Sequence, residues 1–289
     1  KEATIIDGKK ISDKILADLK VKIDQDKKSG GSPAKLAIIL VGNDPASSIY
    51  VQNKIKAAAK VGIETSLQKF EDDILEKDIL DEIQSLNKDK NVSGIIVQLP
   101  LPQHISKLKV IKSIDPSKDV DGFHPVNVGL LYSPYEHGFV PCTARGSLEL
   151  IKSCCPVLVG KNVVVIGRSN IVGRPLAALL LKEDCTVTIC HSKTVNLQAI
   201  TRQADIIISA VGKPGFLTKD YFNEKAVVID VGITRGQSGD KPGLLGDVDF
   251  ENVKKHVKYI TPVPGGVGPM TVAYLLVNTY AAKIGSEQK

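Results

Sequence analysis

A tyrosine and a lysine on one expected helix are the first side chains that could do chemistry together. Tyr50 and Lys54 stand four positions apart in residues 47–61, so both would lie on the same helix face. A lysine amine that is partly removed from water can transfer protons near neutral pH. The same spacing is common on solvent-exposed helix faces, so the pair gains meaning only if other groups converge on it.

A glutamine at the end of an apolar run could be one of those groups. Gln98 lies in residues 94–99, a short apolar segment expected to form a buried strand, and Pro100 and Pro102 follow it. Ligands of open α/β sheets bind outside the carboxyl ends of the strands. An amide there can accept a hydrogen bond from Lys54 and also donate one to a substrate.

Two aspartates precede a glycine turn shortly afterwards. Asp119 and Asp121 are separated by one residue and Gly122 follows them. Paired carboxylates suggest a metal or acid–base chemistry, but no cluster of His or Cys accompanies them, and Asp is frequent in turns. One carboxylate that accepts hydrogen bonds from an adjacent N–H and NH₂ pair needs no metal, so we expect no metal site.

A glycine-containing turn indicates a nucleotide site. Gly167, Ser169 and Gly173 fall between an expected strand at 162–166 and an expected helix at 171–181. Gly167 permits a tight turn and Gly173 permits close packing of helix and strand, while Ser169 takes the place of the usual second glycine of the dinucleotide-binding fingerprint. The amino end of the helix would face a pyrophosphate. Taken alone, the turn is equally compatible with ordinary turn chemistry.

The next expected strand favours NADP over NAD. It covers residues 186–190 and is followed by His191, Ser192 and Lys193, without the acidic residue that usually binds the ribose 2′-hydroxyl of NAD. Ser192 can hydrogen-bond a 2′-phosphate, and Arg168 can supply charge-assisted bonds to it. Arg168 could equally be a solvated loop cation, and His191 is better explained as a structural residue than as a catalytic one.

The elements that must position these side chains alternate along the chain. Strands alternating with helices predict an α/β fold with parallel sheets. The alternation restarts after a stretch rich in Pro, Gly and His at residues 115–146, which predicts two α/β lobes with a cleft between them, the second of the Rossmann type. The remaining expected strands are at 36–41, 63–70, 205–209, 226–230 and 257–261, and the remaining expected helices are at 12–23, 75–87 and 270–283.

Composition excludes several classes of protein. The 289 residues carry 38 basic and 32 acidic side chains, a net charge of +6 without a basic tract, and only 4% aromatic residues. Nucleic-acid binding usually needs a concentrated basic face with aromatic platforms, so we expect a small-molecule partner and no nucleic acid. No apolar stretch approaches about 18 residues, so no membrane partner is expected.

Cysteine usage predicts a reducing compartment. The five cysteines are odd in number and none forms a C-x-x-C pair, which disfavours a disulfide framework and a zinc site. The first residues do not have the pattern of a signal peptide. We therefore expect a cytoplasmic protein, or an organellar one if a leader has been removed.

Six motifs in order make the chain resemble the methylenetetrahydrofolate dehydrogenase/methenyltetrahydrofolate cyclohydrolase family over nearly its whole length. The segment that begins at Thr261 is the most specific of them. The motifs are Tyr50 with Lys54, Val-Gln-Leu-Pro-Leu-Pro at 97–102, Lys-Asp-Val-Asp-Gly at 118–122, the turn at 167–173, Gly-Asp-Val-Asp at 246–249, and Thr-Pro-Val-Pro-Gly-Gly-Val-Gly-Pro-Met-Thr at 261–271.

The resemblance implies a bifunctional enzyme of one-carbon metabolism that serves purine biosynthesis. It would oxidise 5,10-methylenetetrahydrofolate to 5,10-methenyltetrahydrofolate with NADP, then hydrolyse the product to 10-formyltetrahydrofolate, as a homodimer. The alternative within this family is a monofunctional methylenetetrahydrofolate dehydrogenase. Outside it, a non-catalytic NADP-binding protein and a dehydrogenase of the shikimate type remain as rival hypotheses.

The resemblance also implies roles for single residues. Lys54 would be the main proton-transfer group of the hydrolysis, with Gln98 orienting it, Tyr50 stacking on the folate rings and Asp121 anchoring the pterin edge. The other expected substrate contacts are Val97, Leu99, Pro264, Gly265 and Gly266. The expected cofactor contacts are Gly167, Arg168, Ser169, Gly173, Ser192 and Ile233.

The expected domains are discontinuous. By resemblance, the last helix packs on the first lobe, so the folate-binding catalytic domain would comprise residues 1–141 plus 269–289 and the NADP-binding domain residues 142–268. The chain departs from the family after Thr143, where Ala144 and Arg145 occupy positions at which the family commonly has proline. This departure puts the stiffness of the connection between the lobes in question.

Overall fold

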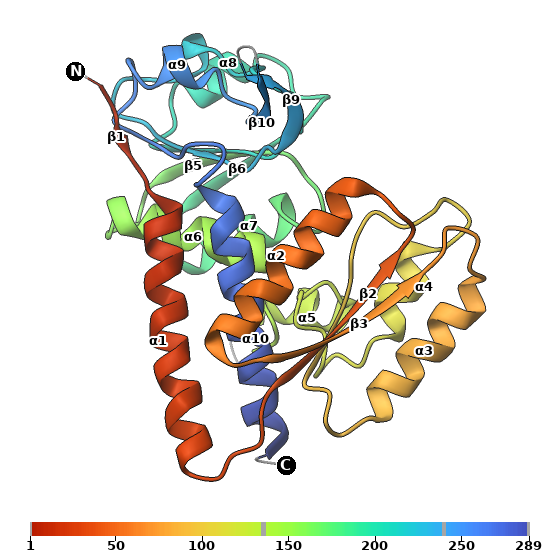
Figure 1. Cartoon of the computed structure of the whole chain (residues 1–289). Coiled ribbons are helices and arrows are strands. Elements are labelled where there is room, and N and C mark those ends of the chain that lie inside the picture. The colour runs from red at the N-terminus through yellow and green to blue at the C-terminus, as the bar shows by residue number, and fades with distance from the viewer. Residues whose placement is uncertain (1, 134–136, 239–240, 288–289) are drawn as a thin grey trace. The chain divides into compact units, whose positions relative to one another are not determined.

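The chain folds into two compact units in a computed structural model, which describes residues 2–133, 137–238 and 241–287. Unit 1 comprises Lys1–Asp13 and Pro141–Thr271, and unit 2 comprises Lys14–Val140 and Val272–Lys289. Figure 1 labels the elements in chain order. Each unit has its own parallel sheet, as expected for chain segments in which strands and helices alternate.

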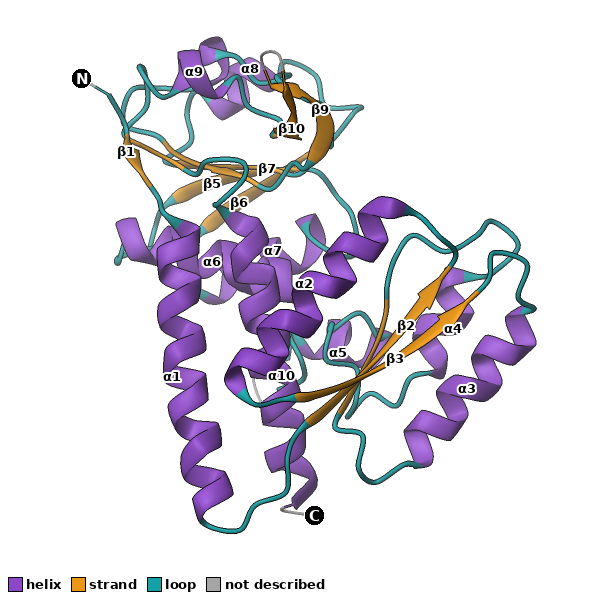
Figure 2. Ribbon diagram, in the orientation of Figure 1, coloured by secondary structure: helices purple, strands orange, loops and turns teal. Residues whose placement is uncertain are grey.

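Unit 2 is built on a three-stranded sheet. Strand β2 (Lys35–Val41) pairs in parallel with β3 (Glu64–Phe70) on one side and with β4 (Gly94–Val97) on the other. The two connections run through α2 (Pro45–Val61) and α3 (Glu76–Lys88). Figure 2 shows α2 on one face of this sheet and α3 on the other. Because both faces are covered, β2 and β4 are almost entirely apolar and buried.

The chain after β4 extends the edge of this sheet. Asp119 forms an isolated parallel bridge with Ile95 of β4, so the segment around Asp119 runs beside that strand. Two short helices flank it, α4 (Lys107–Ser113) and α5 (Pro125–Leu130). The bridge brings the 118–122 motif to the same edge of the sheet as Gln98.

Unit 1 is built on a six-stranded sheet in which every pairing is parallel. From β5 the chain goes to β6 on one side and then to β7 and β8 on the other, so the strand order reverses beside β5. Such a reversal is the point at which dinucleotides bind in Rossmann folds. In spatial order the strands are β1 (Thr4–Ile5), β11 (Tyr259–Ile260), β8 (Val227–Asp230), β7 (Ile206–Ser209), β5 (Asn162–Ile166) and β6 (Thr186–Cys190).

The remaining elements of unit 1 pack around this sheet. Its core is formed by the buried strands β5, β7 and β8 together with Phe222, Val253 and Val257. A two-stranded antiparallel hairpin, β9 (Thr234–Ser238) with β10 (Lys241–Leu245), follows β8. The helices are α6 (Cys142–Cys154), α7 (Gly173–Lys182), α8 (Leu197–Thr201), α9 (Phe250–Val253) and the 3₁₀ turn η1 (Lys219–Tyr221).

Two long helices each contribute residues to both units. Helix α1 (Gly8–Lys28) begins in unit 1 and continues in unit 2, and α10 (Val267–Glu287) does the same. The sequence predicted both helices, but shorter, at 12–23 and 270–283. The predicted domains place residues 1–13 in the folate-binding lobe, whereas the contacts group them with unit 1 because β1 pairs with β11.

The expected strands and helices are present, with shifted ends. The strand expected at 94–99 ends at Val97, before the prolines, and the strand expected at 257–261 is only two residues long. The hairpin β9–β10, strand β1, the helices α4, α5, α6, α8 and α9 and the turn η1 were not predicted. All of them except α6 are short, so tertiary contacts rather than sequence periodicity define them.

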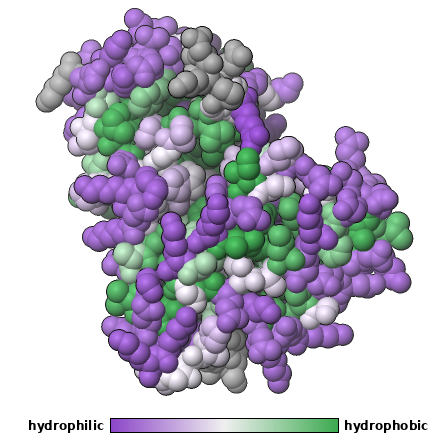
Figure 3. Space-filling model, in the orientation of Figure 1, coloured by the Kyte–Doolittle hydropathy of each residue, from purple (hydrophilic) through white to green (hydrophobic). Residues whose placement is uncertain are grey.

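Hydrophilic side chains cover much of the surface on the face that Figure 3 shows, with small apolar areas between them. Among the residues that the structure describes, no helix combines the length and apolar character needed to cross a membrane.

An ion pair between the two long helices gives a test of the packing in unit 2. Lys283 of α10 is only 3% exposed, and its ammonium donates to the carboxylate of Asp26 on α1. We expect Asp26→Asn to lower the free energy of unfolding by about 3 kcal/mol, because a buried ammonium loses its carboxylate. Lys283→Met should cost less, because it leaves no buried charge. Urea unfolding measures both variants, and equal losses would contradict this account.

Candidate active site

A hydrogen bond between Lys54 and Gln98 is the centre of the site in unit 2. The Nζ of Lys54 donates to Oε1 of Gln98 at 2.9 Å, although the two residues are 44 positions apart. Both side chains are half-buried. The structure therefore contains the contact that the sequence suggested between the expected helix and the end of the expected strand.

The local sequence explains where Lys54 lies. Helix α2 begins with Pro45 in its first turn, and the side chain of Asp44 caps it by accepting from the amide of Ser47 at 2.7 Å. These signals fix the start of the helix directly after β2. Tyr50 precedes Lys54 by one turn and is 37% exposed.

The end of β4 fixes the orientation of Gln98. Its backbone N–H still donates to the carbonyl of Ile39 at 2.9 Å, so its position is set by the sheet. Its side-chain Nε2 donates to the carbonyl of Leu99 at 2.9 Å. With the amide nitrogen held in this way, Oε1 is turned toward Lys54 as an acceptor.

The two aspartates of the 118–122 motif have different environments. Asp119 is 1% exposed and accepts from the amides of Phe123 at 3.2 Å and His124 at 2.8 Å, and from the side chain of Asn127 at 2.8 Å. Its carboxylate is thus fully used in holding the turn. Residue spacing alone did not separate the two aspartates; only the family resemblance singled out Asp121.

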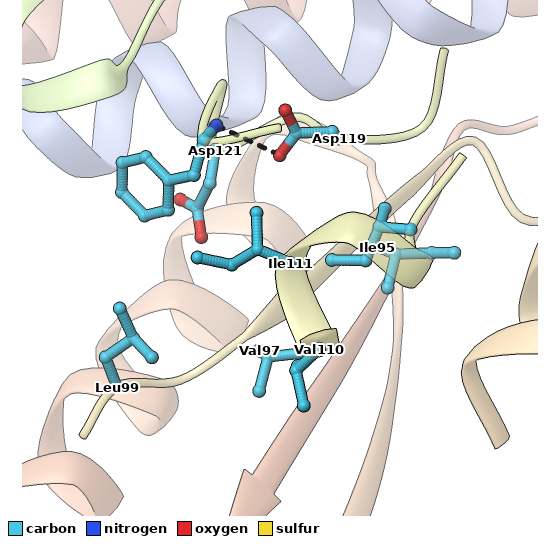
Figure 4. A pocket seen from close by; sticks show the side chains of 9 residues that line it. Ile95, Val97, Leu99, Val110, Ile111, Asp119 and Asp121 are labelled. Atoms are coloured by element: carbon cyan, nitrogen blue, oxygen red, sulfur yellow. Dashed lines mark hydrogen bonds between the residues drawn. The ribbon is translucent and has the colours of Figure 1, made fainter. Parts of the chain in front are cut away.

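Asp121 keeps its carboxylate available and lies beside a small pocket. The pocket is lined mainly by apolar side chains, among them Val97 of β4, Leu99 after this strand and Ile111 of α4. Figure 4 shows the carboxylate of Asp121 pointing toward this space, whereas that of Asp119 turns to a backbone amide. Burial raises the pKa of Asp121 to about 6; the charge of Lys54 opposes this rise and that of Asp119 adds to it.

Lys118 has a structural role that the sequence did not reveal. Its Nζ donates to the carbonyls of Leu86, Asn87 and Asp89 at 2.7–3.0 Å, at the carboxyl end of α3. The helix end supplies unpaired carbonyls that a cation can satisfy. Burial lowers the pKa of Lys118. Lys118 thereby ties the segment that carries Asp121 to a helix behind the sheet.

In unit 1, two glycines form the turn between β5 and α7. Gly167 has φ +126°, and a Cβ on it would lie 2.5 Å from the carbonyl oxygen of Ala210. A Cβ on Gly173 would lie 2.1 Å from the carbonyl oxygen of Gly167. No other residue fits at either position, because real Cβ atoms do not approach other atoms that closely. The turn lies directly after the central strand, at the reversal of strand order.

Ser169 organises this turn with its side chain. Its Oγ accepts from the amides of Val172 at 3.1 Å and Gly173 at 3.4 Å, just before α7. The sequence placed Ser169 where a second glycine is usual. The structure adds that this hydroxyl ties the turn to the two amides that lead into the helix, whose N-cap position is Val172.

The side chains expected at the cofactor's adenosine end are exposed. Arg168 and Ser192 follow β5 and β6, which are neighbouring strands. No acidic residue stands directly after β6, so nothing there would repel a 2′-phosphate. His191 has a structural contact, because its Nδ1 accepts from the amide of Lys193 at 3.2 Å. Ile233 follows β8 and is 41% exposed.

The segment after β11 packs on the first turn of α1 within unit 1. Gly265 has φ +100°, and its carbonyl accepts from the amide of Lys9 at 3.0 Å. A Cβ on Gly8 would lie 1.9 Å from the carbonyl oxygen of Gly266. Pro264 is exposed on this turn. Of the expected substrate contacts, Pro264, Gly265 and Gly266 thus belong to unit 1 and the others to unit 2.

The five cysteines are free thiols. Burial raises the pKa of Cys154 to about 11 and also raises the pKa values of Cys185 and Cys190. In the part of the chain that the structure describes, no three His, Cys, Asp or Glu side chains come together in a way that could hold a metal ion.

Comparisons with known proteins agree on one family. A family model described as the catalytic domain of tetrahydrofolate dehydrogenase/cyclohydrolase matches residues 6–121, and the NAD(P)-binding domain model of the same family matches residues 141–286. A bifunctional protein FolD from Rickettsia bellii is 59% identical over 278 residues, which cover 96% of this chain and 97% of that protein.

Solved structures agree as well. The bifunctional FolD methylenetetrahydrofolate dehydrogenase/cyclohydrolase of Campylobacter jejuni is 49% identical and superposes with a TM-score of 0.93, covering 98% of this chain and 99% of that one. The enzyme of Trypanosoma brucei, complexed with NADP and an inhibitor, is 38% identical with a TM-score of 0.95, and both chains are covered completely.

The close packing at Gly173 gives a test of the nucleotide turn. We expect Gly173→Ala to raise the dissociation constant for NADP by about tenfold or more, because the added Cβ would push the turn away from its position. Gly285→Ala, at a position with open space around it, should leave the constant unchanged. Fluorescence titration with NADPH measures both. Wild-type affinity in Gly173→Ala would show that the turn does not hold the cofactor.

Proposed function

Because this chain belongs to the tetrahydrofolate dehydrogenase/cyclohydrolase family, we propose a division of its two reactions among the residues described above. The chain is a bifunctional enzyme with NADP as its cofactor. It oxidises 5,10-methylenetetrahydrofolate to 5,10-methenyltetrahydrofolate and hydrolyses the product to 10-formyltetrahydrofolate. Both activities belong to the family, so a monofunctional dehydrogenase is the weaker interpretation.

The oxidation requires no general acid or base. A hydride leaves the one-carbon bridge of the substrate, and the resulting positive charge spreads over the two nitrogens that flank this carbon. When bound, NADP supplies the hydride acceptor. The chain's contribution is to hold the reactants in contact, and we assign cofactor binding to Gly167, Arg168, Ser169, Gly173, Ser192 and Ile233. Two observations support this assignment: the glycine turn lies where the strand order of the sheet reverses, and no acidic residue follows β6.

The hydrolysis does require proton transfer. Water adds to the cationic carbon, one bond from that carbon to nitrogen breaks, and a proton must leave the water while another reaches the departing nitrogen. We assign this transfer to Lys54 and the orientation of its amine to Gln98. The hydrogen bond of 2.9 Å between them is the observation that carries the proposal.

The substrate's ring system is assigned to groups around this pair. An ionised Asp121 can accept two hydrogen bonds from the N–H and NH₂ edge of a pterin, and the exposed ring of Tyr50 can stack on it. We also assign substrate contacts to Val97 and Leu99 beside Gln98, and to Pro264, Gly265 and Gly266. Val97 and Leu99 line the small apolar space beside Asp121, which supports the assignment of these two residues.

We further propose that the enzyme is a homodimer in the cytoplasm, and that its product supplies one-carbon units to purine biosynthesis. Five free thiols suit a reducing compartment. We also propose that the catalytic domain comprises residues 1–141 plus 269–289, and the NADP-binding domain residues 142–268, a functional division that differs from the compact units mainly at residues 1–13, which group with unit 1.

Removing the amine of Lys54 should separate the two activities. We expect Lys54→Met to lower methenyl hydrolysis by about a hundredfold or more and to change hydride transfer by less than about tenfold, because only hydrolysis needs the proton transfer. Absorbance of the methenyl compound and NADPH production measure the two steps. Lys56→Met, on an exposed position of the same helix, is the control. Equal loss of both activities in a folded Lys54→Met protein would refute this division.

The raised pKa of Asp121 predicts a pH dependence. Because this pKa is about 6, the carboxylate is ionised above that pH and becomes neutral below it. We expect kcat/KM for methenyl hydrolysis to fall about tenfold per pH unit below pH 6, since the neutral form accepts hydrogen bonds poorly. Asp121→Asn should give a lower kcat/KM that lacks this fall. If the same fall persists in Asp121→Asn, another group is responsible for it.

A further inference from the structure

Two buried carboxylates in unit 1 have no part in the assignments above. Asp230 is the last residue of β8 and is 3% exposed, and Asp247 follows β10 and is fully buried. Asp247 belongs to the Gly-Asp-Val-Asp motif at 246–249, for which no role was predicted. Both lie beside the loops at the carboxyl edge of the six-stranded sheet, which is the edge where ligands bind in this fold.

Asp247 holds the loop that follows β7. Its Oδ2 accepts from the hydroxyl of Ser209 and from the amide of Val211, and its Oδ1 accepts from the amide of Lys213, each at 2.8 Å. One carboxylate therefore holds the hydroxyl of the last residue of β7 and two backbone amides of the loop that follows it. Because the side chain is fully buried and both of its oxygens already accept hydrogen bonds, it does not bind a ligand directly.

This loop is also in direct contact with the glycine turn at 167–173. The amide of Ala210 donates to the carbonyl of Ile166 at 2.8 Å, and the Cα of Gly167 approaches Ala210 so closely that a Cβ would meet its oxygen at 2.5 Å. Strands β5 and β7 are direct neighbours in the sheet. A shift of the loop after β7 would therefore move the turn after β5.

Asp230 holds Asp247 in turn. Its Oδ1 accepts from the amides of Gly232 at 2.9 Å and Asp247 at 3.0 Å, and its Oδ2 accepts from the amide of Val248 at 2.9 Å. The same carboxylate thus fixes the loop that leads from β8 to Ile233. Three strand-end loops, those after β5, β7 and β8, are connected through the pair.

Two glycines make room for the side chains of Asp230 and Asp247. A Cβ on Gly246 would lie 2.0 Å from Oδ2 of Asp230, and a Cβ on Gly232 would lie 2.3 Å from Cγ of Asp247. Only glycine fits at either position. The two glycines therefore leave the space that the two buried carboxylates occupy.

Ionising the buried carboxyl of Asp230 costs stability. Burial raises the pKa of Asp230 to about 7, against the pull of its three amide donors, and the neighbouring charge of Asp247 adds to the rise. A carboxyl whose pKa is raised on folding lowers the free energy of unfolding as the pH increases from about 4 to about 7.

We propose that Asp247, supported by Asp230, is a positioning residue for NADP. It does not touch the cofactor. Instead, the pair fixes the loop after β7, which contacts the glycine turn, and the loop after β8, which carries Ile233. This inference rests on the assignment of the cofactor to that turn. If it holds, NADP binding requires a carboxylate that the cofactor itself does not contact.

The experiment compares two Asp→Asn variants of the full-length enzyme. In Asp247→Asn, an NH₂ group replaces one acceptor oxygen, so at least one of the three loop contacts is lost. We expect the dissociation constant for NADP to rise by about tenfold or more, with KM for NADP rising in parallel. Hydride-transfer kcat at saturating NADP should change less than about threefold.

Asp205→Asn is the matched control. Asp205 also accepts a backbone amide with its carboxylate, that of Asn162 at 2.9 Å, but at the amino ends of β5 and β7. This variant should bind NADP with wild-type affinity even if its thermal stability falls. Ser209→Ala, which removes only one donor to Asp247, should raise the dissociation constant by a smaller factor and serves if Asp247→Asn does not fold.

The outcomes separate the inference from the function. If wild-type enzyme binds NADP, and Asp247→Asn and Ser209→Ala bind it equally well, the positioning role is wrong while the cofactor assignment stands. If Asp205→Asn weakens binding as much as Asp247→Asn, the effect is general destabilisation and the inference also fails. If the wild-type enzyme does not bind NADP, the proposed function itself fails.

Discussion

The hydrogen bond between Lys54 and Gln98 is the interaction on which the chemistry of unit 2 depends. It joins a side chain of α2 to the residue that follows β4, and it exists because β2 pairs in parallel with β4 and α2 starts directly after β2. Parallel pairing brings the carboxyl ends of strands to one edge. The amide of Gln98 is held at its other end by Leu99, so the acceptor oxygen has a defined direction.

Buried carboxylates serve the same purpose in both units. Asp119 uses both of its oxygens to hold the turn that presents Asp121, and Asp247 uses both of its oxygens to hold the loop beside the glycine turn. In each case the residue that is buried and saturated with donors is not the one assigned to the ligand. Rigid support of this kind is what a site needs if its groups are to stay within hydrogen-bonding reach of a substrate.

The sequence predicted the α/β class, most of the strands and the contact between Lys54 and Gln98, because alternating apolar runs and strand-end residues carry that information locally. Spacing alone did not distinguish Asp119 from Asp121, and only the family resemblance singled out Asp121; the physical difference, the bridge to Ile95 and the contact of Asp119 with Asn127, depends on the fold. It also missed strand β1, whose two residues become a strand only by pairing with β11, more than 250 positions later. Ser169 was predicted as a substitute for glycine, whereas its hydrogen bonds to backbone amides depend on the folded turn.

The most direct test of the account is a double-mutant cycle for methenyl hydrolysis with Lys54→Met and Gln98→Met, measured in single turnovers with excess enzyme and corrected for spontaneous hydrolysis. If Gln98 acts by orienting the amine of Lys54, Gln98→Met will slow hydrolysis strongly in the wild-type background and have no further effect once Lys54 is absent. If Gln98→Met slows hydrolysis by the same factor in both backgrounds, the two side chains act independently and the central hydrogen bond is not part of the mechanism.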